Sequence, residues 1–213
     1  METIRGKVSR ELDFNEFKER LAGYNRVSLD LGTGDGRYVH YLAERNPRWF
    51  VIGVDSCREN LHEHSRAKLP NILFIVAGAL KLPRELHGLA SHITINFPWG
   101  SLLKGLLMAD PALMDGLAGS AQTVASLEIR LNSGALAETG TTLEAGAVRI
   151  RDNLLRSGWL VGGLNIMDAC ALRTFPSTWA RRLAVGRDHR AISMSGSASQ
   201  SLPAEHQMTM TWQ

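Results

Sequence analysis

Leu29–Gly36, which reads LDLGTGDG, decides the fold of this chain. The alternating apolar residues Val27, Leu29 and Leu31 predict a buried strand that runs directly into three glycines spaced two residues apart. Glycine lets a chain turn sharply and brings bare backbone against a ligand. The stretch therefore predicts a strand that is followed by a nucleotide-type binding loop.

The charge and spacing of this loop separate it from dinucleotide-binding loops. Those loops have the spacing G-x-G-x-x-G and place a pyrophosphate at a helix N-terminus. Here the spacing is G-x-G-x-G, and the carboxylates of Asp30 and Asp35 would repel a pyrophosphate. An acid-flanked loop suits a cationic ligand, and we expect Asp30, Gly32, Gly34 and Asp35 to bind one.

A second acid follows at the end of the next predicted strand. Phe50–Asp55 reads FVIGVD, and Asp55 comes about 20 residues after the glycine loop, where a carboxylate can accept both ribose hydroxyls of a nucleoside. Alternatively, the loop is only a tight turn and Asp55 only caps a helix. The two features together favour the nucleoside site.

Composition limits the class of protein. The chain has 213 residues, of which 44% are hydrophobic and 21% are charged, as in a soluble domain with one core. We expect a single domain over residues 1–196 and a polar, frayed tail over residues 197–213. Met1–Arg5 lacks the apolar stretch of a signal peptide, and no apolar run reaches the roughly 20 residues of a membrane span. We therefore expect a cytoplasmic monomer without a membrane partner, and Cys57 and Cys170 predict neither a disulfide nor a metal site.

The hydrophobic pattern alternates between strands and helices along the chain. Seven segments read as strands, at about 26–31, 49–54, 71–77, 91–97, 124–131, 159–169 and 191–195. The loop 132–142 is rich in small residues, and we expect it to be mobile. The pattern predicts an α/β fold with a mostly parallel seven-stranded sheet and helices on both faces, in which ligands bind at the carboxyl ends of the strands.

Two tryptophans are expected at that edge of the sheet. Trp99 follows the fourth strand, between Pro98 and Ser101, and Trp179 lies beside Ser177 in the linker between the sixth and seventh strands. An aromatic pair can stack on both faces of a flipped base. A single tryptophan at a strand end more often packs against the core, and we assign that role to the remaining ones: Trp49, Trp159 and Trp212.

Basic residues gather near Trp179. The net charge of +3 is too small to indicate nucleic-acid binding by itself. The segment 179–190, however, holds four arginines and a histidine against one acid. A cluster of charged residues usually forms only a solvent-exposed face. Next to a pair of aromatic rings that can hold a base, however, the arginines are well placed to bind RNA phosphates. The candidate RNA-binding residues are Arg66 and Lys68, between the second and third strands, and Arg181, Arg182, Arg187 and Arg190.

Three segments together resemble a known family. Asp30–Gly36, Phe97–Leu103 and Trp179–Arg187 are similar to the Kam/Npm family of aminoglycoside-resistance 16S rRNA (adenine-N1)-methyltransferases, and the resemblance runs from about residue 4 to residue 196. It implies the class I fold, which is Rossmann-like, of methyltransferases that depend on S-adenosyl-L-methionine (SAM). It further implies SAM as the cofactor without a metal, and methylation of a decoding-site adenosine in the small ribosomal subunit, with kanamycin and apramycin resistance.

The resemblance also implies roles for single residues. Trp99 and Trp179 would sandwich the flipped adenosine while the backbone at Pro98 meets its Watson–Crick edge. Ser101 and Ser177 would lie beside the methionine end of SAM. Asp30 and Asp55 would hold SAM, with S-adenosylhomocysteine as the product, and Arg182 and Arg187 would contact rRNA phosphates. We add Arg190 to these because it lies close to them in the sequence.

The chain also departs from the family pattern. After the third strand, Gly78 and Ala79 leave room for an adenine ring, but Leu80 stands where the family usually has an acid. The basic linker is reduced to Ser65–Pro70. Two alternatives therefore stay open: a SAM methyltransferase of another RNA or of a small molecule, and a weakly active ribosome-binding homologue.

Overall fold

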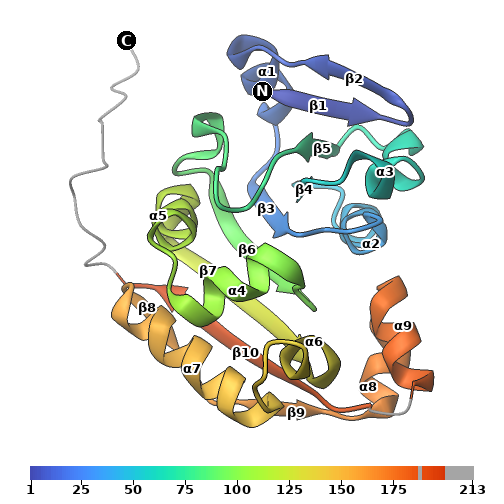
Figure 1. The fold of residues 1–213 in the computed structure, drawn as a ribbon. Helices are drawn as coiled ribbons and strands as arrows, with labels where there is room; N and C mark the ends of the chain where they lie inside the picture. The colour runs from blue at the N-terminus through green and yellow to red at the C-terminus, as the bar shows by residue number, and fades with distance from the viewer. Residues whose placement is uncertain (187–188, 200–213) are drawn as a thin grey trace.

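A ten-stranded sheet runs through the computed structural model, which describes residues 1–186 and 189–199 (Figure 1). The strands lie in the order β2-β1-β5-β4-β3-β6-β7-β10-β8, and β9 pairs with β10. Their bounds are β1 (Glu2–Arg5), β2 (Val8–Glu11), β3 (Arg26–Leu31), β4 (Trp49–Asp55), β5 (Ile72–Val76), β6 (Ala90–Asn96), β7 (Ala121–Asn132), β8 (Trp159–Val161), β9 (Asn165–Met167) and β10 (Ala191–Ala198). The helices are α1 (Phe14–Leu21), α2 (Arg37–Arg45), α3 (Arg58–Leu61), α4 (Gly100–Met108), α5 (Pro111–Ser120), α6 (Ser133–Ala137), α7 (Leu143–Arg156), α8 (Ala169–Thr174) and α9 (Thr178–Val185), with short 3-10 helices η1 (His64–Arg66) and η2 (Arg84–Leu86).

The centre of the sheet is parallel. β3 pairs with β4 on one side and β6 on the other, so that Asp30 lies between Gly53 and Thr94. The order of the strands reverses at β3, and in such a sheet the ligand crevice opens beyond the carboxyl ends of the strands at that point. β10 is antiparallel to β7 and to β8. The predicted α/β class is therefore confirmed, with the glycine loop at the crevice.

The predicted number of strands was wrong. The N-terminal segment forms the hairpin β1–β2, which pairs with β5 through Thr3 and Ile75. The predicted sixth strand is two short strands, β8 and β9, because the chain leaves the sheet at Gly162 and Gly163. β10 runs through Ala198, beyond the expected boundary at residue 196, and residues 200–213 of the expected tail lie outside the described part.

The loop predicted to be mobile contains a helix. α6 buries Leu136 against α7, where an added Cβ on Gly146 would lie 2.5 Å from the leucine side chain. The small residue on α7 thus allows the close approach of a five-residue helix. Helix α6 was not predicted because its sequence, rich in Gly, Ser and Ala, resembles that of a loop.

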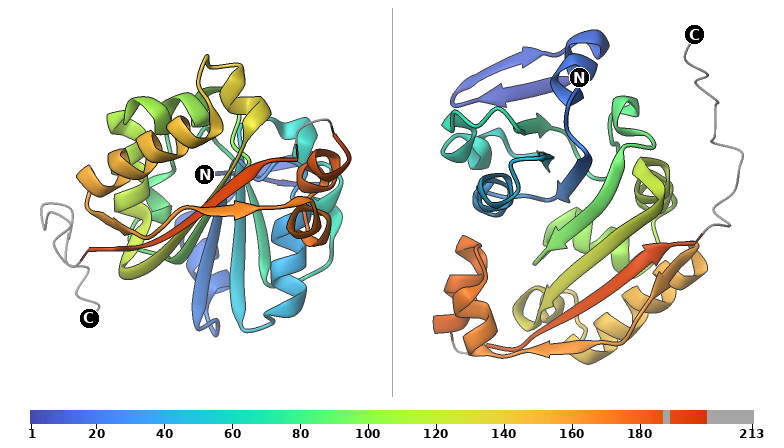
Figure 2. Two further views of the ribbon diagram at one scale, coloured as in Figure 1. Left: turned by 90° about the horizontal axis from the view of Figure 1, so that it is seen from below. Right: turned by 180° about the vertical axis from the view of Figure 1, so that it is seen from behind.

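Helices cover both faces of the sheet (Figure 2). Phe50, Ile52 and Val54 of β4 join the apolar cluster that includes residues of α1, α4, α5 and α7, whereas the intervening Val51 joins the cluster of α2 and α3. Burying each such side chain contributes roughly 1.5–3 kcal/mol. A third cluster joins α8 and α9 to Phe97 at the end of β6 and thereby fixes these helices at the crevice. No helix within the described ranges combines the length and apolar character needed to cross a membrane.

Candidate active site

The glycine loop between β3 and α2 requires its glycines. Gly32, Gly34 and Gly36 have φ angles of 68°, 59° and 78°, in the left-handed region that side chains disfavour. A Cβ on Gly32 would also lie 2.7 Å from Leu102, and one on Gly36 would lie 2.4 Å from the ring of Phe74. A Cβ on Gly34 would meet nothing within 4 Å. The loop is thus tightly packed at both ends and open in the middle.

Asp55 at the end of β4 organises this loop. Its Oδ2 accepts the backbone N–H of Gly34 at 2.8 Å, and its Oδ1 accepts that of Cys57 at 2.9 Å. The predicted pairing of loop and acid is therefore present, and Cys57 rather than Asp55 is the N-cap residue of α3. Because a carboxylate offers about four lone-pair positions, Asp55 can still accept ribose hydroxyls.

Asp30 lies beneath the loop and is only 1% exposed. Its Oδ1 accepts hydrogen bonds from Thr94 Oγ1 at 2.5 Å and from Asn96 Nδ2 at 2.9 Å, and Asn96 Oδ1 accepts one from Arg130 Nη1 at 2.9 Å. Burial raises the pKa of Asp30 to about 6, against the opposing effect of these hydrogen bonds and of Arg130. Sequence reasoning missed Thr94, Asn96 and Arg130, although polar residues inside predicted central strands were a usable signal.

Trp99 and Trp179 stack on one another. Their ring centroids are 6.0 Å apart and their planes differ by 18°. Trp99 is the N-cap residue of α4 and Trp179 lies in the first turn of α9, and the side chains are 46% and 48% exposed. The guanidinium of Arg182 lies 5.5 Å from the Trp179 ring. Folding thus joins the two predicted rings at the surface.

An aromatic cluster supports this pair from below. Phe97, directly before Pro98, has a φ of 53°, which is rare for a residue with a side chain and strains the backbone there. The ring of Phe97 meets Phe175 edge-on at 5.7 Å. Phe175 in turn stacks on Tyr38 at 5.1 Å and lies under Arg130 at 4.6 Å. The segments that carry both tryptophans therefore rest on one cluster.

A direct hydrogen bond also ties α9 to the glycine loop. Thr178 Oγ1 donates to Asp35 Oδ2 at 2.5 Å, while Asp35 Oδ1 accepts the N–H of Arg37 at 3.1 Å. Thr178 immediately precedes Trp179. Sequence reasoning missed this contact because its partners are 143 residues apart and no local pattern links them.

The other candidate cofactor residues lie after β5 and at the starts of α4 and α9. Gly78, which is exposed, and Ala79, which is half-buried, follow β5. Leu80 packs against the core, where an added Cβ on Gly105 of α4 would lie 3.2 Å from its side chain. Ser101 is exposed in the first turn of α4, and Ser177 is the half-buried N-cap residue of α9. Among the described residues, no group of three or more His, Cys, Asp or Glu is placed to hold a metal ion.

The candidate RNA-binding residues fall into two groups. Arg181 and Arg182 are exposed on α9, and Arg190 precedes β10, with its Nη1 3.5 Å from Glu144 Oε1 of α7. Arg66 and Lys68 are exposed in the segment that follows α3. The sixth candidate, Arg187, lies outside the described residues.

Comparison with known proteins identifies the family. A family model described as NpmA, 16S rRNA (adenine(1408)-N(1))-methyltransferase, matches residues 2–198. The chain belongs to this family. A curated 16S rRNA (adenine(1408)-N(1))-methyltransferase of Escherichia coli is 30% identical over 214 residues, which cover 92% of this chain and 98% of the relative.

Solved structures of this methyltransferase family share the fold. A variant of the 16S rRNA (adenine(1408)-N(1))-methyltransferase of Catenulisporales acidiphilia, solved with the cosubstrate SAM, is 27% identical, with a TM-score of 0.80 over 93% of this chain and 97% of that one. The aminoglycoside resistance methyltransferase NpmB1 is 30% identical, with a TM-score of 0.75 over 92% of this chain and 98% of that one. The expected class I, Rossmann-like methyltransferase fold is confirmed.

Proposed function

We propose that this protein transfers a methyl group from SAM to N1 of the decoding-site adenosine of 16S rRNA, the position named 1408 in its family. The observation that carries the proposal is the stacked pair Trp99 and Trp179, whose second member follows Thr178, the residue bonded to Asp35 of the glycine loop. The protein acts in the cytoplasm as a monomer on the small ribosomal subunit. Methylation adds a positive charge to the base, which disfavours the binding of polycationic aminoglycosides such as kanamycin and apramycin.

The residues around the loop fit SAM. Bound SAM supplies an electrophilic methyl on a sulfonium, and it carries an ammonium group. The buried carboxylate of Asp30, whose pKa is raised to about 6, gains a favourable partner when such a cation approaches. Asp55 has capacity for the ribose, and the backbone at Gly34 faces open space. Gly78 and Ala79 leave room for the adenine, with Ser101 and Ser177 toward the methionine end.

The chemistry requires orientation rather than a general base. The lone pair of adenine N1 lies in the plane of the ring and is mostly unprotonated at neutral pH, so it can attack a methyl group directly. Trp99 and Trp179 hold the base, the backbone at Pro98 meets its Watson–Crick edge, and fixed geometry lowers the barrier by several kcal/mol. A base between two rings needs about 7 Å from ring to ring, so the tryptophans move apart when it enters. Arg181, Arg182, Arg187 and Arg190, together with Arg66 and Lys68, bind rRNA phosphates.

Replacement of Trp179 tests the proposal. Stacking of a base on an aromatic ring is worth about 1–3 kcal/mol, so Trp179→Ala is expected to reduce tritium transfer from SAM to purified small subunits by about 10- to 100-fold. SAM affinity, measured by calorimetry, should be retained, and Trp179→Phe should recover part of the activity because it keeps a stacking face. Unchanged transfer by Trp179→Ala would defeat the proposed sandwich.

Two further measurements separate the alternatives. A reverse-transcription stop at the decoding-site adenosine, after incubation with protein and SAM, distinguishes this function from methylation of another RNA or of a small molecule. Calorimetry with SAM and S-adenosylhomocysteine distinguishes a working enzyme from a weakly active ribosome-binding homologue.

Expression in a sensitive host should raise the inhibitory concentrations of kanamycin and apramycin.

A further inference from the structure

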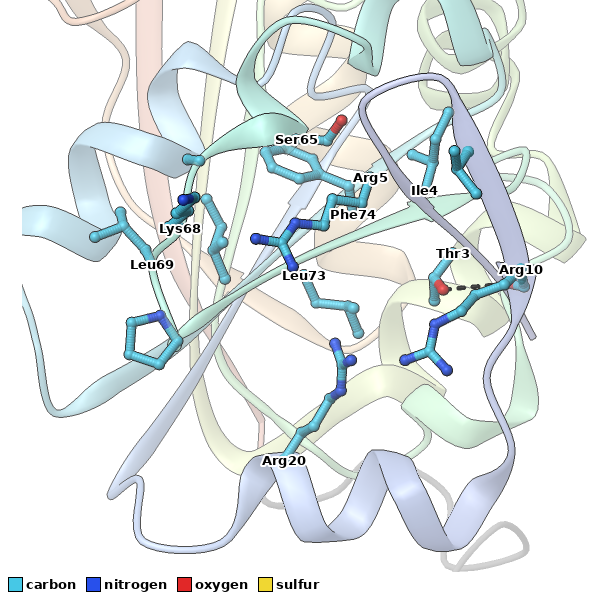
Figure 3. A pocket seen from close by; sticks show the side chains of 14 residues that line it. Thr3, Ile4, Arg5, Arg10, Arg20, Ser65, Lys68, Leu69, Leu73 and Phe74 are labelled. Atoms are coloured by element: carbon cyan, nitrogen blue, oxygen red, sulfur yellow. Dashed lines mark hydrogen bonds between the residues drawn. The ribbon is translucent and has the colours of Figure 1, made fainter.

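A basic groove lies away from the tryptophan pair. The hairpin β1–β2, the end of α1, β5 and residues 65–70 line this open groove, which has a volume of about 570 Å³. Figure 3 shows the side chains of Arg5, Arg10 and Arg20 directed into this groove from different elements. Lys68 adds a fourth cation, and the described residues that line the groove include no acid. Several cations that share one cavity without a lining acid indicate an anion-binding surface.

The walls of the groove are fixed to one another. The backbone N–H of Gly6, at the hairpin turn, donates to Ser65 Oγ at 2.8 Å in a buried hydrogen bond. Gly6 has a φ of 61°, and an added Cβ would lie 3.3 Å from the side chain of Arg66. The hairpin therefore closes over the shortened basic linker and places Arg5 next to it.

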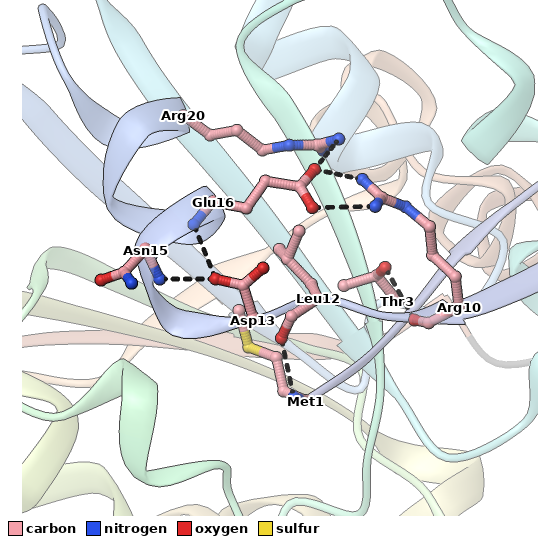
Figure 4. Close-up of polar contacts among 8 residues, drawn as sticks. All are labelled: Met1, Thr3, Arg10, Leu12, Asp13, Asn15, Glu16 and Arg20. Atoms are coloured by element: carbon pink, nitrogen blue, oxygen red, sulfur yellow. Dashed lines mark hydrogen bonds and ion pairs between the residues drawn. The ribbon is translucent and has the colours of Figure 1, made fainter.

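A single acid positions two of the arginines without neutralising the groove. Glu16 on α1 binds Arg10 through both carboxylate oxygens and also accepts from Arg20 at 3.1 Å (Figure 4). This cluster keeps one surplus positive charge, and Arg5 and Lys68 each contribute another. The guanidinium groups are thus pre-oriented, which reduces the entropy cost when they bind a ligand.

We propose that this groove, called the hairpin groove, binds a segment of the rRNA phosphate backbone in addition to the contacts at α9. The cations arise from four separate segments of the chain, so they suit a polyanion with repeated phosphates better than a single small anion. Apolar residues of β1 and β5, among them Ile4 and Leu73, also line the groove and offer surface for a ribose or base. The inference rests on the proposed function, because it takes the ribosomal subunit as the partner.

Binding measured as a function of salt provides the first test. In the double variant Arg5→Ala, Arg20→Ala, the dissociation constant for purified small subunits should rise about 3- to 10-fold for each phosphate that the variant no longer binds. The slope of log affinity against log salt concentration should fall by about 0.7–0.9 for each of these phosphates. The double variant Arg5→Lys, Arg20→Lys keeps the charges and should keep the slope. Arg149→Ala, on the exposed side of α7, serves as the matched control and should change neither quantity.

Directed cleavage provides the second test. Val8 lines the groove and is 70% exposed, so an iron chelate that generates hydroxyl radicals can be attached to Val8→Cys in a Cys57→Ser, Cys170→Ser background. The positive control carries the chelate on the exposed native Cys170 of α8. Cleavage of 16S rRNA from position 8 supports the proposal.

Three outcomes would overturn it. These are an unchanged salt slope in the alanine double variant, cleavage from Cys170 but not from position 8, and cleavage from position 8 that is confined to ribosomal protein. Failure of the proposed function would give a different result. The wild-type protein would still bind subunits through the hairpin groove, but it would not methylate the decoding-site adenosine.

Discussion

Removal of the Thr178 hydroxyl should weaken catalysis while leaving the fold and the cofactor site intact. Thr178→Val keeps the shape of the side chain but removes the 2.5 Å hydrogen bond to Asp35. A hydrogen bond to a charged group is worth about 1.5–3 kcal/mol, and the smaller value applies here because Asp35 is only half-buried and water can replace the donor. That energy corresponds to a decrease of roughly 10-fold in kcat/KM for small subunits.

The assay separates a positioning role from a merely structural one. Tritium transfer from SAM to small subunits should fall in Thr178→Val and recover in Thr178→Ser, which restores the donor, while calorimetry should show nearly unchanged SAM affinity. Thr174→Val is the matched control, because the hydroxyl of Thr174 donates only to backbone oxygens of its own helix, at 3.1 Å. Wild-type kcat/KM in Thr178→Val, or an equal decrease in Thr174→Val, would refute the reasoning.

Substitutions of Asp30 and of two loop glycines test how the site contributes to stability. The raised pKa of Asp30, about 6 against an ordinary 3.8, means that the folded protein holds this proton more tightly than the unfolded chain does, so stability falls as pH rises from about 4 to 6, by up to about 3 kcal/mol. Asp30→Asn should abolish that pH dependence in urea unfolding and weaken SAM binding in calorimetry; a retained dependence would contradict the assignment. Gly36→Ala should lower the free energy of unfolding by about 3 kcal/mol, through φ strain and the clash with Phe74, whereas Gly34→Ala should cost only about 1 kcal/mol because its space is open. Equal thermal shifts of these two alanine variants would show that the clash is unimportant.

The central part of the fold followed from local patterns. The strand that ends in glycines and the strand that ends in Asp55 are long, apolar and bounded by clear breaks, so periodicity identified them. The hairpin β1–β2 and the pair β8 and β9 consist of strands of three or four residues, too short for a period to stand out. The place of the hairpin beside β5, and of β8 and β9 beside β10, depends on partners far along the chain, which local pattern does not reveal.

The candidate site was likewise predicted only in part from the sequence. Trp99 and Trp179 were predicted to lie together because both follow elements that end at the same edge of the sheet. The polar network around Asp30 was missed because Thr94 and Asn96 alternate with apolar residues in the way that surface positions of a strand do. Asp35 was predicted to serve the cofactor, but its bond to Thr178 depends on the docking of α9.

The stacked indoles have a consequence for selectivity. With centroids 6.0 Å apart, each ring covers a face that an incoming purine would need. Any nucleobase must first disrupt a contact of about 0.5–1.5 kcal/mol, and this cost is the same for every candidate. An adenine in an unanchored single strand has few other contacts with the protein whose binding energy could offset this cost. A nucleotide of a bound ribosomal subunit has many such contacts. In the proposed reaction, opening the rings would therefore weaken the binding of every adenine by the same factor, about 2- to 13-fold, and selectivity would have to come from the contacts that anchor the ribosome.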